Sequence, residues 1–410
     1  MAKSWRHIMA DFFQNGMITT LHRIGDPQLP KIQSELKRLC QKRPLTILIP
    51  CLISEFKGRA LAGIRDTIMK LNYVDQLVIT LDLANRGGFN LAKRFFSKIP
   101  QRVRIVWIDG KKIAKLLNIL KKNDLNPGSR GKGRAVWLGI GYLLSIGREQ
   151  AIVVHDADIV NYDPWVVARL AYPVVNPSLN YEFCKSYYAR VTDRLYGRVT
   201  RLFFTPLLRT FKRIFPEMRI LNYLDSFRYP LSGELSFTTE LAPHLMVPSD
   251  WGLELGLLVQ IYYTVSLDRV CQTDIADRFD HKHQILIKSK PNQGLMRMSI
   301  DITKTFFRTL SEEGVVFSGG FFKTLRLSYI RIAKSFVKKY NDLAKINQLR
   351  FDLHREMTAV ESFANALEVA YDEFIRSPVG VPLTPSWHRV FAAIPKFFDQ
   401  LYQAVEEDNR

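Results

Sequence analysis

The sequence predicts an α/β protein with a parallel sheet and helices on both of its faces, followed by a helical C-terminal region. Two observations predict this fold class. Four strand-length apolar runs, rich in β-branched residues, alternate with helical stretches over roughly the first 160 residues. From about residue 290, apolar residues recur at helical spacing instead. Strands that alternate with helices need crossover connections, which make the sheet parallel.

The expected strands are residues 46–52, 76–81, 102–108 and 151–157, and helices are expected over 58–71, 90–99 and 132–147. The strands are almost continuously apolar, as in sheets buried on both faces. Ligands of such open sheets bind beyond the carboxyl ends of the strands, and polar or charged residues follow each run there. No GxGxxG follows the first strand and no Walker sequence is present, which disfavours those two nucleotide-binding classes.

The C-terminal region is expected to form three amphipathic helical stretches. The first carries apolar residues at helical spacing, namely Leu325, Tyr329, Ile332, Phe336, Tyr340 and Leu343. The other two cover roughly residues 350–376 and 386–405. We expect these helices to pack on the α/β domain with solvated basic faces, because no RNP-like motif or zinc-finger spacing indicates nucleic-acid binding.

The composition narrows the class of partner without fixing it. With 59 Lys and Arg against 39 Asp and Glu, the chain favours polyanions: nucleic acid, anionic lipid or phosphorylated small molecules. The cysteines form no CxxC, which predicts reduced, buried thiols in a cytoplasmic protein; they are Cys40, Cys51, Cys184 and Cys271. No apolar run reaches the roughly 18–20 residues that span a bilayer, and the N-terminal segment lacks a signal-peptide block. We therefore expect no stable membrane insertion.

The stretch AIVVHDADIV ends a buried strand with two carboxylates, Asp156 and Asp158. Residues i and i+2 of an extended chain point the same way, so the two like charges would raise each other's pKa. A divalent cation would remove the repulsion, and Mg²⁺ or Mn²⁺ binds such carboxylates together with substrate phosphates. The alternative is that one aspartate caps the turn at NYDP, but the pattern favours a metal site.

Two further motifs carry polar groups suited to a ligand. Lys132, bracketed by glycines at a predicted helix start in NPGSRGKGRAVW, suits an anion, although a flexible loop would look the same. Gly197, Arg198 and Thr200 in YGRVTRLFFTPLLR suit a phosphate or carboxylate, although in isolation they read as an ordinary helix start.

The remaining candidates are acidic residues and histidines. Glu234 in YPLSGELSF and Glu254 in SDWGLELGLL lie in apolar, glycine-containing surroundings, where carboxylates usually have a partner or a task. In DRFDHKHQ, His281 or His283 would complete the aspartate metal site. A pair of histidines in a loop is more commonly polar surface, so the motif alone leaves both interpretations open.

In this order the motifs resemble the glucosyl-3-phosphoglycerate synthase family of retaining glycosyltransferases, relatives of mannosylglycerate synthase, over roughly residues 45–290. The resemblance implies a GT-A glycosyltransferase fold with a Rossmann-like, mostly parallel sheet, helices on both faces and a helical C-terminal region. The predicted divisions are an N-terminal helical segment (1–44), a nucleotide-sugar-binding half (45–160), an acceptor-binding half (161–290) and the C-terminal region (291–410).

The resemblance also implies roles for individual residues. For the donor, PCLISE supplies a uridine pocket and the lysine and DxD motifs meet the diphosphate; the residues are Pro50, Leu52, Glu55, Lys132, Asp156 and Ala157. The intact GRVT motif, with Gly197, Arg198 and Thr200, binds the acceptor's phosphoglycerate. The metal ligands are Asp158, Asp156 and His281 (or His283). The residues given a catalytic role are Asp158, Glu234, Glu254 and Lys132.

The implied reaction moves glucose, with retention, from an NDP-glucose to 3-phosphoglycerate, which leads toward the compatible solute glucosylglycerate. A cytoplasmic homodimer that needs Mg²⁺ or Mn²⁺ and no nucleic-acid partner is expected. No protein nucleophile is expected, and the leaving phosphate would assist front-face attack. One alternative is a related transferase that uses GDP-mannose, free glycerate or a lipid phosphate. Another is a basic nucleic-acid- or membrane-binding protein on a degenerate transferase fold. The sequence leaves the donor base and the sugar open.

Overall fold

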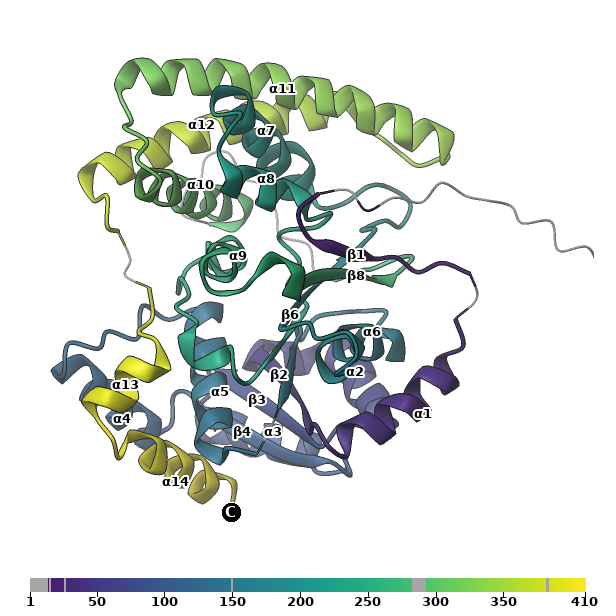
Figure 1. The fold of residues 1–410 in the computed structure, drawn as a ribbon, viewed down its shortest axis with the longest axis vertical. Helices are drawn as coiled ribbons and strands as arrows, with labels where there is room; N and C mark the ends of the chain where they lie inside the picture. The colour runs from purple at the N-terminus through teal and green to yellow at the C-terminus, as the bar shows by residue number, and fades with distance from the viewer. Residues whose placement is uncertain (1–13, 15, 26, 149, 282–292, 381–382) are drawn as a thin grey trace, which may run out of the picture.

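The computed structural model describes residues 14, 16–25, 27–148, 150–281, 293–380 and 383–410. In this described part, eight strands form one sheet in the order β1-β8-β6-β7-β5-β2-β3-β4 (Figure 1). The strands are β1 (Thr19–Leu21), β2 (Leu45–Leu52), β3 (Gln76–Asp82), β4 (Arg102–Trp107), β5 (Ala151–Val154), β6 (Phe183–Tyr188), β7 (Leu235–Thr238) and β8 (Val270–Ala276). The four expected strands are therefore found, at adjacent positions in the sheet.

The sheet is mixed rather than wholly parallel. The strands β5, β2, β3 and β4 run parallel, as predicted, and so do β6, β8 and β1. Between these two groups β7 runs antiparallel to both neighbours. The prediction of a mostly parallel sheet is confirmed. The N-terminal segment, expected to be helical, holds the strand β1 as well as a helix, because Thr19–Leu21 pair in register with Cys271–Thr273.

Helices precede or follow nearly every strand. In the first part of the chain these are α1 (Leu29–Cys40), η1 (Ile53–Lys57), α2 (Ala60–Ile68), α3 (Arg86–Phe96), α4 (Lys111–Lys122), α5 (Lys132–Ile146), α6 (Pro164–Val175), η2 (Val199–Phe204), α7 (Thr205–Ile214), α8 (Arg219–Ser226), η3 (Ala242–His244), α9 (Leu253–Thr264) and η4 (Leu267–Arg269). The C-terminal helices are α10 (Gly294–Glu312), α11 (Gly319–Ile346), α12 (Leu353–Arg376), α13 (Trp387–Ala393) and α14 (Phe397–Asn409). The last expected stretch is thus two helices, which are separated at Pro395, where a proline disfavours helix continuation.

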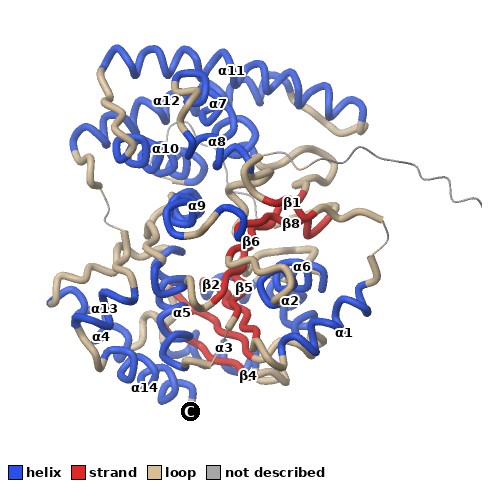
Figure 2. The backbone as a smooth tube through the Cα atoms, viewed as in Figure 1, coloured by secondary structure: helices blue, strands red, loops and turns tan. Residues whose placement is uncertain are grey.

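Helices cover both faces of the sheet (Figure 2). Successive residues of β2 alternate between two apolar cores, with Ile47 and Ile49 in one and Leu48 in the other. The helices α1, α2, α3 and α6 fill the first core, and α5 fills the second. The helices α10, α11 and α12 pack with α7 in a separate layer beyond α9, whereas α14 packs on β4, α4 and α5 (Figure 1).

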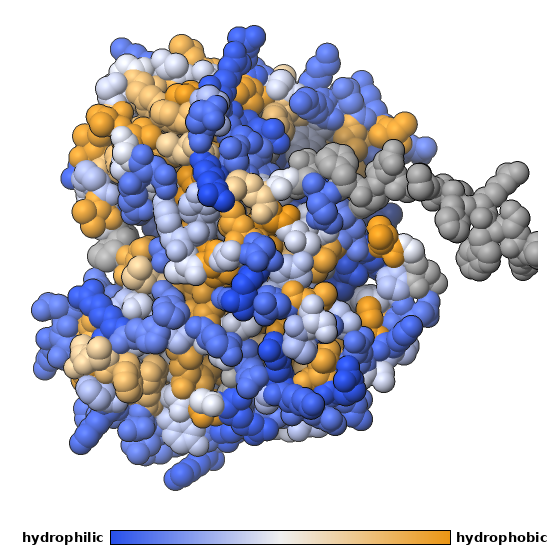
Figure 3. All heavy atoms as spheres, in the orientation of Figure 1, coloured by the Kyte–Doolittle hydropathy of each residue, from blue (hydrophilic) through white to orange (hydrophobic). Residues whose placement is uncertain are grey.

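The surface shown in Figure 3 is hydrophilic for the most part, with hydrophobic side chains gathered at the upper left over the C-terminal helices. None of the helices among the described residues is both long enough and apolar enough to span a membrane.

One partly buried carboxylate fixes α14 to β4 and α5. Glu406 accepts hydrogen bonds from Arg104 Nε at 2.8 Å, Arg102 Nη2 at 3.1 Å and the Tyr142 hydroxyl at 2.6 Å. Its side chain is only 16% exposed. Burial alone would raise the pKa of Glu406, but the hydrogen bonds from Arg104 and Tyr142 outweigh it and lower the pKa to about 2. The charged form therefore stabilises the fold.

We expect Glu406→Gln to lower the free energy of unfolding by about 2 kcal/mol at neutral pH, because the charged acceptor of three donors is lost. A depressed pKa in the folded state stabilises the protein above the unfolded pKa near 4.5, and this stabilisation disappears as the pH falls toward 2. The difference between variant and parent in urea melts should shrink over that range. Glu407→Gln, at an adjacent and half-exposed carboxylate, is the control and should change nothing measurable.

Candidate active site

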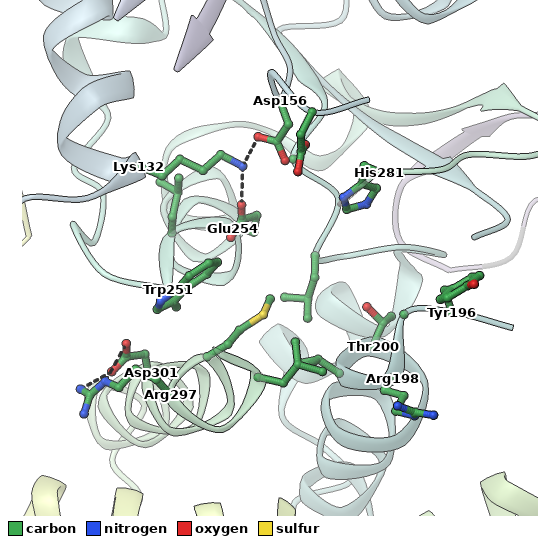
Figure 4. Close-up of a pocket in the computed structure, with 18 of the residues that line it drawn as sticks. Lys132, Asp156, Tyr196, Arg198, Thr200, Trp251, Glu254, His281, Arg297 and Asp301 are labelled. Carbon is green, nitrogen blue, oxygen red and sulfur yellow. Dashed lines mark hydrogen bonds and ion pairs between the residues drawn. The ribbon is translucent and has the colours of Figure 1, made fainter. Parts of the chain in front are cut away.

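A cavity of about 1360 Å³ opens at the carboxyl ends of β2, β3 and β5 and reaches the C-terminal helices α10 and α12. Most residues predicted from the sequence line it: Pro50, Leu52, Glu55, Lys132, Asp156, Ala157, Asp158, Gly197, Arg198, Thr200, Glu254 and His281. Glu234 lies beneath the surface, behind Gly233, and His283 lies outside the described residues. Figure 4 shows Lys132, Asp156 and Glu254 toward one end and Arg198 and Thr200 toward the other.

Lys132 is the first residue of α5 and lies between two carboxylates. Its ammonium is 2.6 Å from Asp156 Oδ1 and 3.0 Å from Glu254 Oε1 (Figure 4). Burial alone would lower the pKa of Lys132, but the charges of Asp156 and Glu254 raise it, so the lysine stays protonated. The ammonium is thus fixed at the helix start, where backbone N–H groups also favour an anion.

The glycines on either side of Lys132 allow another segment to approach closely. A Cβ on Gly131 would lie 2.2 Å from the Ser249 carbonyl oxygen, and one on Gly133 would lie 2.0 Å from that of Pro248. A third glycine protects the ion pair itself. A Cβ on Gly233 would lie 2.5 Å from Asp156 Oδ2 and 2.8 Å from Lys132 Nζ.

The two aspartates do not lie on an extended strand, as the sequence had led us to expect. β5 ends at Val154, and the DxD residues form the turn that follows. Asp156 therefore turns to Lys132; although burial opposes it, this ammonium lowers the pKa of Asp156. Burial and the charge of Asp156 raise the pKa of Asp158 to about 7. The mutual repulsion expected of the pair is thus present at Asp158.

The loop that carries His281 is joined to this turn. Ile159 and His281 form an antiparallel bridge, and the Val160 N–H donates to the Asp280 carbonyl at 2.8 Å. The Asn161 side chain donates to the Arg278 carbonyl at 2.7 Å. These bonds place the imidazole of His281 beside the DxD turn, more than a hundred residues away in sequence (Figure 4).

A buried lysine and a buried glutamate lie under the site. The sequence indicated the glutamate but not the lysine. Lys185 of β6 donates to the Ser232 carbonyl at 2.6 Å, and burial lowers its pKa to about 8. Glu234 accepts from the Tyr188 hydroxyl at 2.7 Å, and burial followed by the charge of Asp156 raises its pKa to about 7. No hydrogen-bond partner for Glu234 Oε1 is seen in the described part of the chain.

The donor set fits a divalent cation. Two ammonium groups face four carboxyl groups in this cluster: Lys132 and Lys185 against Asp156, Asp158, Glu234 and Glu254. Burial and then the negative charge of Asp156 raise the pKa values of Asp158 and Glu234, and a cation would offset this negative charge. Carboxylate oxygens with an imidazole suit Mg²⁺ or Mn²⁺. Among the described residues, no three such ligands already converge on one point.

The GRVT segment forms the other end of the cavity. Gly197 has φ +71°, a conformation that favours glycine, and Thr200 is buried in η2. The guanidinium of Arg198 donates through Nε to Glu356 of α12 at 2.7 Å. The sequence did not indicate Glu356. This residue lies 158 positions after Arg198 in the chain, in a helix to which no role was assigned.

Further cavity residues were missed beside the donor positions. Arg130 pairs with Asp82 at 3.3 Å and with Asp109. These two carboxylates directly follow the predicted strands 76–81 and 102–108, where ligand-binding residues were expected. Leu83, at φ +56°, and the half-exposed Trp251 also line the cavity. The signal for Arg130 lay in its position two residues before Lys132, but a loop arginine does not identify its partners.

No protein-family model matches the chain. Two curated relatives cover nearly all of it. The glucosyl-3-phosphoglycerate synthase of Persephonella marina is 46% identical over 98% of this chain and 99% of its own length. The protein of the same name from Methanococcoides burtonii is 34% identical over 97% of this chain and 98% of its own length.

Solved structures share the fold. Glucosyl-3-phosphoglycerate synthase from Mycobacterium tuberculosis, in complex with Mn²⁺, UDP-glucose and phosphoglyceric acid, superposes with a TM-score of 0.52 at 24% identity, covering 74% of this chain and 89% of that one. Mannosyl-3-phosphoglycerate synthase from Rubrobacter xylanophilus gives 0.52 at 23% identity, over 70% and 80%. The predicted GT-A fold is confirmed. With relatives this similar along nearly its whole length, the chain belongs to the glucosyl-3-phosphoglycerate synthase family.

Proposed function

We propose that the protein transfers glucose from UDP-glucose to 3-phosphoglycerate with retention of configuration, in a reaction that needs Mg²⁺ or Mn²⁺. One observation carries the proposal: a single cavity joins the Lys132–carboxylate cluster to the GRVT segment. The first suits a nucleoside diphosphate and the second a phosphorylated acceptor. Two relatives support the choice of substrates: the enzyme named for this reaction in Persephonella marina, and the Mycobacterium tuberculosis structure that holds both substrates.

The donor end would act mainly by electrostatics. The protonated Lys132 can exchange its carboxylate partners for the diphosphate and stabilise the charge that develops on the leaving nucleotide. A cation bound by Asp158, Asp156 and His281 would neutralise the same charge as a Lewis acid. Pro50, Leu52 and Glu55 would hold the base at the end of β2, and Ala157 would lie against the donor between the two aspartates.

The two glutamates would have different tasks. Glu254 lines the cavity and can accept hydrogen bonds from sugar hydroxyls. Glu234 is 1% exposed behind Gly233, so it would act through Tyr188 and the local charge rather than by contact.

The acceptor hydroxyl attacks the anomeric carbon on the face that the diphosphate leaves. The new C–O bond forms as the bond to the diphosphate breaks, and a phosphate oxygen takes the hydroxyl proton.

The acceptor would be bound by the backbone of Gly197, the guanidinium of Arg198 and the hydroxyl of Thr200. We further infer a homodimer that works in the cytoplasm. The inference of a cytoplasmic site is supported by the cysteines of the described chain, which are all buried and free. The inference of a homodimer rests on the family resemblance of the sequence.

A donor-by-acceptor activity matrix tests the function. The donors are UDP-glucose, GDP-glucose and GDP-mannose, and the acceptors are 3-phosphoglycerate and free glycerate. We expect the highest kcat/KM for UDP-glucose with 3-phosphoglycerate, and loss of turnover in EDTA that added Mg²⁺ or Mn²⁺ restores. Preference for GDP-mannose would favour the mannosyl-3-phosphoglycerate synthase reaction, which the name of the Rubrobacter neighbour suggests. No turnover with any pair would refute the proposed reaction.

Arg198→Ala should raise the KM for 3-phosphoglycerate about 10- to 100-fold, because a charged hydrogen-bond donor to the phosphate is lost. The KM for UDP-glucose should stay within twofold. Arg209→Ala, at an arginine of α7 that is half-exposed and pairs with Asp225, is the matched control. An unchanged acceptor KM in Arg198→Ala would contradict the assignment of GRVT to the phosphate.

Gly233→Ala should lower kcat at least about 10-fold, because the new methyl group would displace the Asp156 carboxylate or the Lys132 ammonium from their pair. Gly63→Ala, on an exposed site of α2 with no atom within 4 Å of the new Cβ, should leave kcat unchanged. Steady-state kinetics at saturating substrates compare the two variants. Equal kcat values would mean that the close approach at Gly233 is not needed for turnover.

A further inference from the structure

The C-terminal helix α12 takes part in the acceptor end of the cavity. Asp352, His354 and Arg355, which stand at its start, line the cavity together with Arg198. The next residue, Glu356, is 4% exposed and lies behind this wall. Its two oxygens accept from two arginines of the GRVTR segment, Oε1 from Arg198 Nε at 2.7 Å and Oε2 from Arg201 Nη2 at 2.9 Å.

Arg201 is held from several sides and gives Glu356 a fixed position. Its Nε donates to the Tyr196 carbonyl at 2.7 Å, and its Nη2 also donates to the Leu195 carbonyl at 3.2 Å. Its guanidinium lies over the Tyr340 ring of α11, 4.8 Å from the centroid. These contacts fix the position of Arg201, and its positive charge balances that of Glu356 whatever Arg198 binds.

Arg198 is held at one edge only. Among the described residues, Nε is the nitrogen of this guanidinium that makes a hydrogen bond, and the side chain is 23% exposed on the cavity wall. The two terminal nitrogens form a planar pair that matches two oxygens of a phosphate. Without Glu356, the like charge of Arg201 would repel Arg198 and its side chain would lose a fixed orientation.

We propose that Glu356 is a positioning residue of the acceptor site: it grips Arg198 by Nε and aims the two terminal nitrogens at the acceptor's phosphate. The inference rests on the proposed function, and it assigns the C-terminal helix a part in acceptor recognition. Because a side chain that is already oriented loses less entropy on binding, the effect should appear in acceptor affinity rather than in the chemical step.

Glu356→Gln tests the proposal with the full-length protein. We expect the KM for 3-phosphoglycerate to rise about tenfold, with kcat and the KM for UDP-glucose within twofold. In the Arg198→Ala background the same change should not raise the acceptor KM further, because Glu356 acts through Arg198. If Glu356 had a merely structural role, its replacement would impair acceptor binding equally in the parent and in Arg198→Ala. Glu368→Gln, at a half-exposed carboxylate of α12 that pairs with Arg326 of α11, is the matched control.

The outcomes separate this inference from the proposed function. If the unmutated protein does not use 3-phosphoglycerate, the proposed function fails. If it does, but Glu356→Gln leaves the acceptor KM unchanged or has additive effects with Arg198→Ala, the positioning role is refuted. Should Glu356→Gln not fold, as judged by thermal melting, Glu356→Asp decides. Its shorter side chain keeps the charge but not both contacts, so an acceptor KM equal to that of the parent would overturn the proposal.

Discussion

The pairing of Lys132, whose side chain is 30% exposed, with two carboxyl groups is the interaction on which the site depends. An ammonium out of water is costly unless it is paired, and here Asp156 and Glu254 pair it from two different elements. The start of α5, the turn after β5 and the first turn of α9 must therefore meet at one point. Glycines at 131, 133 and 233 allow the approach, because any side chain there would occupy the space of the partner segments.

The cluster also explains which parts of the fold the sequence could predict. The runs that became β2, β3 and β5 are apolar because both of their faces are buried, and this local pattern identified them together with the residues at their ends. The run of β4 is only partly buried, but its Val103, Ile105, Val106 and Trp107 still gave a strand pattern. β6 was not predicted, because its sequence FCKSYY carries the buried Lys185, which breaks the apolar pattern. β1 and β7 are only three and four residues long, and their pairing is decided by distant strands.

The same division holds for the site. Lys132, both aspartates, Glu254 and the GRVT segment all line one cavity, and each has a local signature in the sequence. The partners of these residues have none. Nothing near Glu356 in sequence indicates two arginines about 155 residues earlier, and the turn of Asp156 toward Lys132 follows from the early end of β5. Sequence thus identified the groups that carry charge, and tertiary structure decided which of them neutralise one another.

Gly233 and the DxD turn lie side by side at one end of a pair of antiparallel strands, and this has an evolutionary consequence. Val154 pairs with Leu235, so Gly233, two residues before β7, and the turn after β5 are kept next to each other by the pairing of these two strands. A change in the register between β5 and β7, even one that the apolar core tolerated, would move Gly233 away from Asp156 and Lys132. Selection for a foldable sheet and selection for the geometry of this cluster therefore act on the same positions, whereas the cavity wall formed by α12 lies outside the sheet and is not tied to its register.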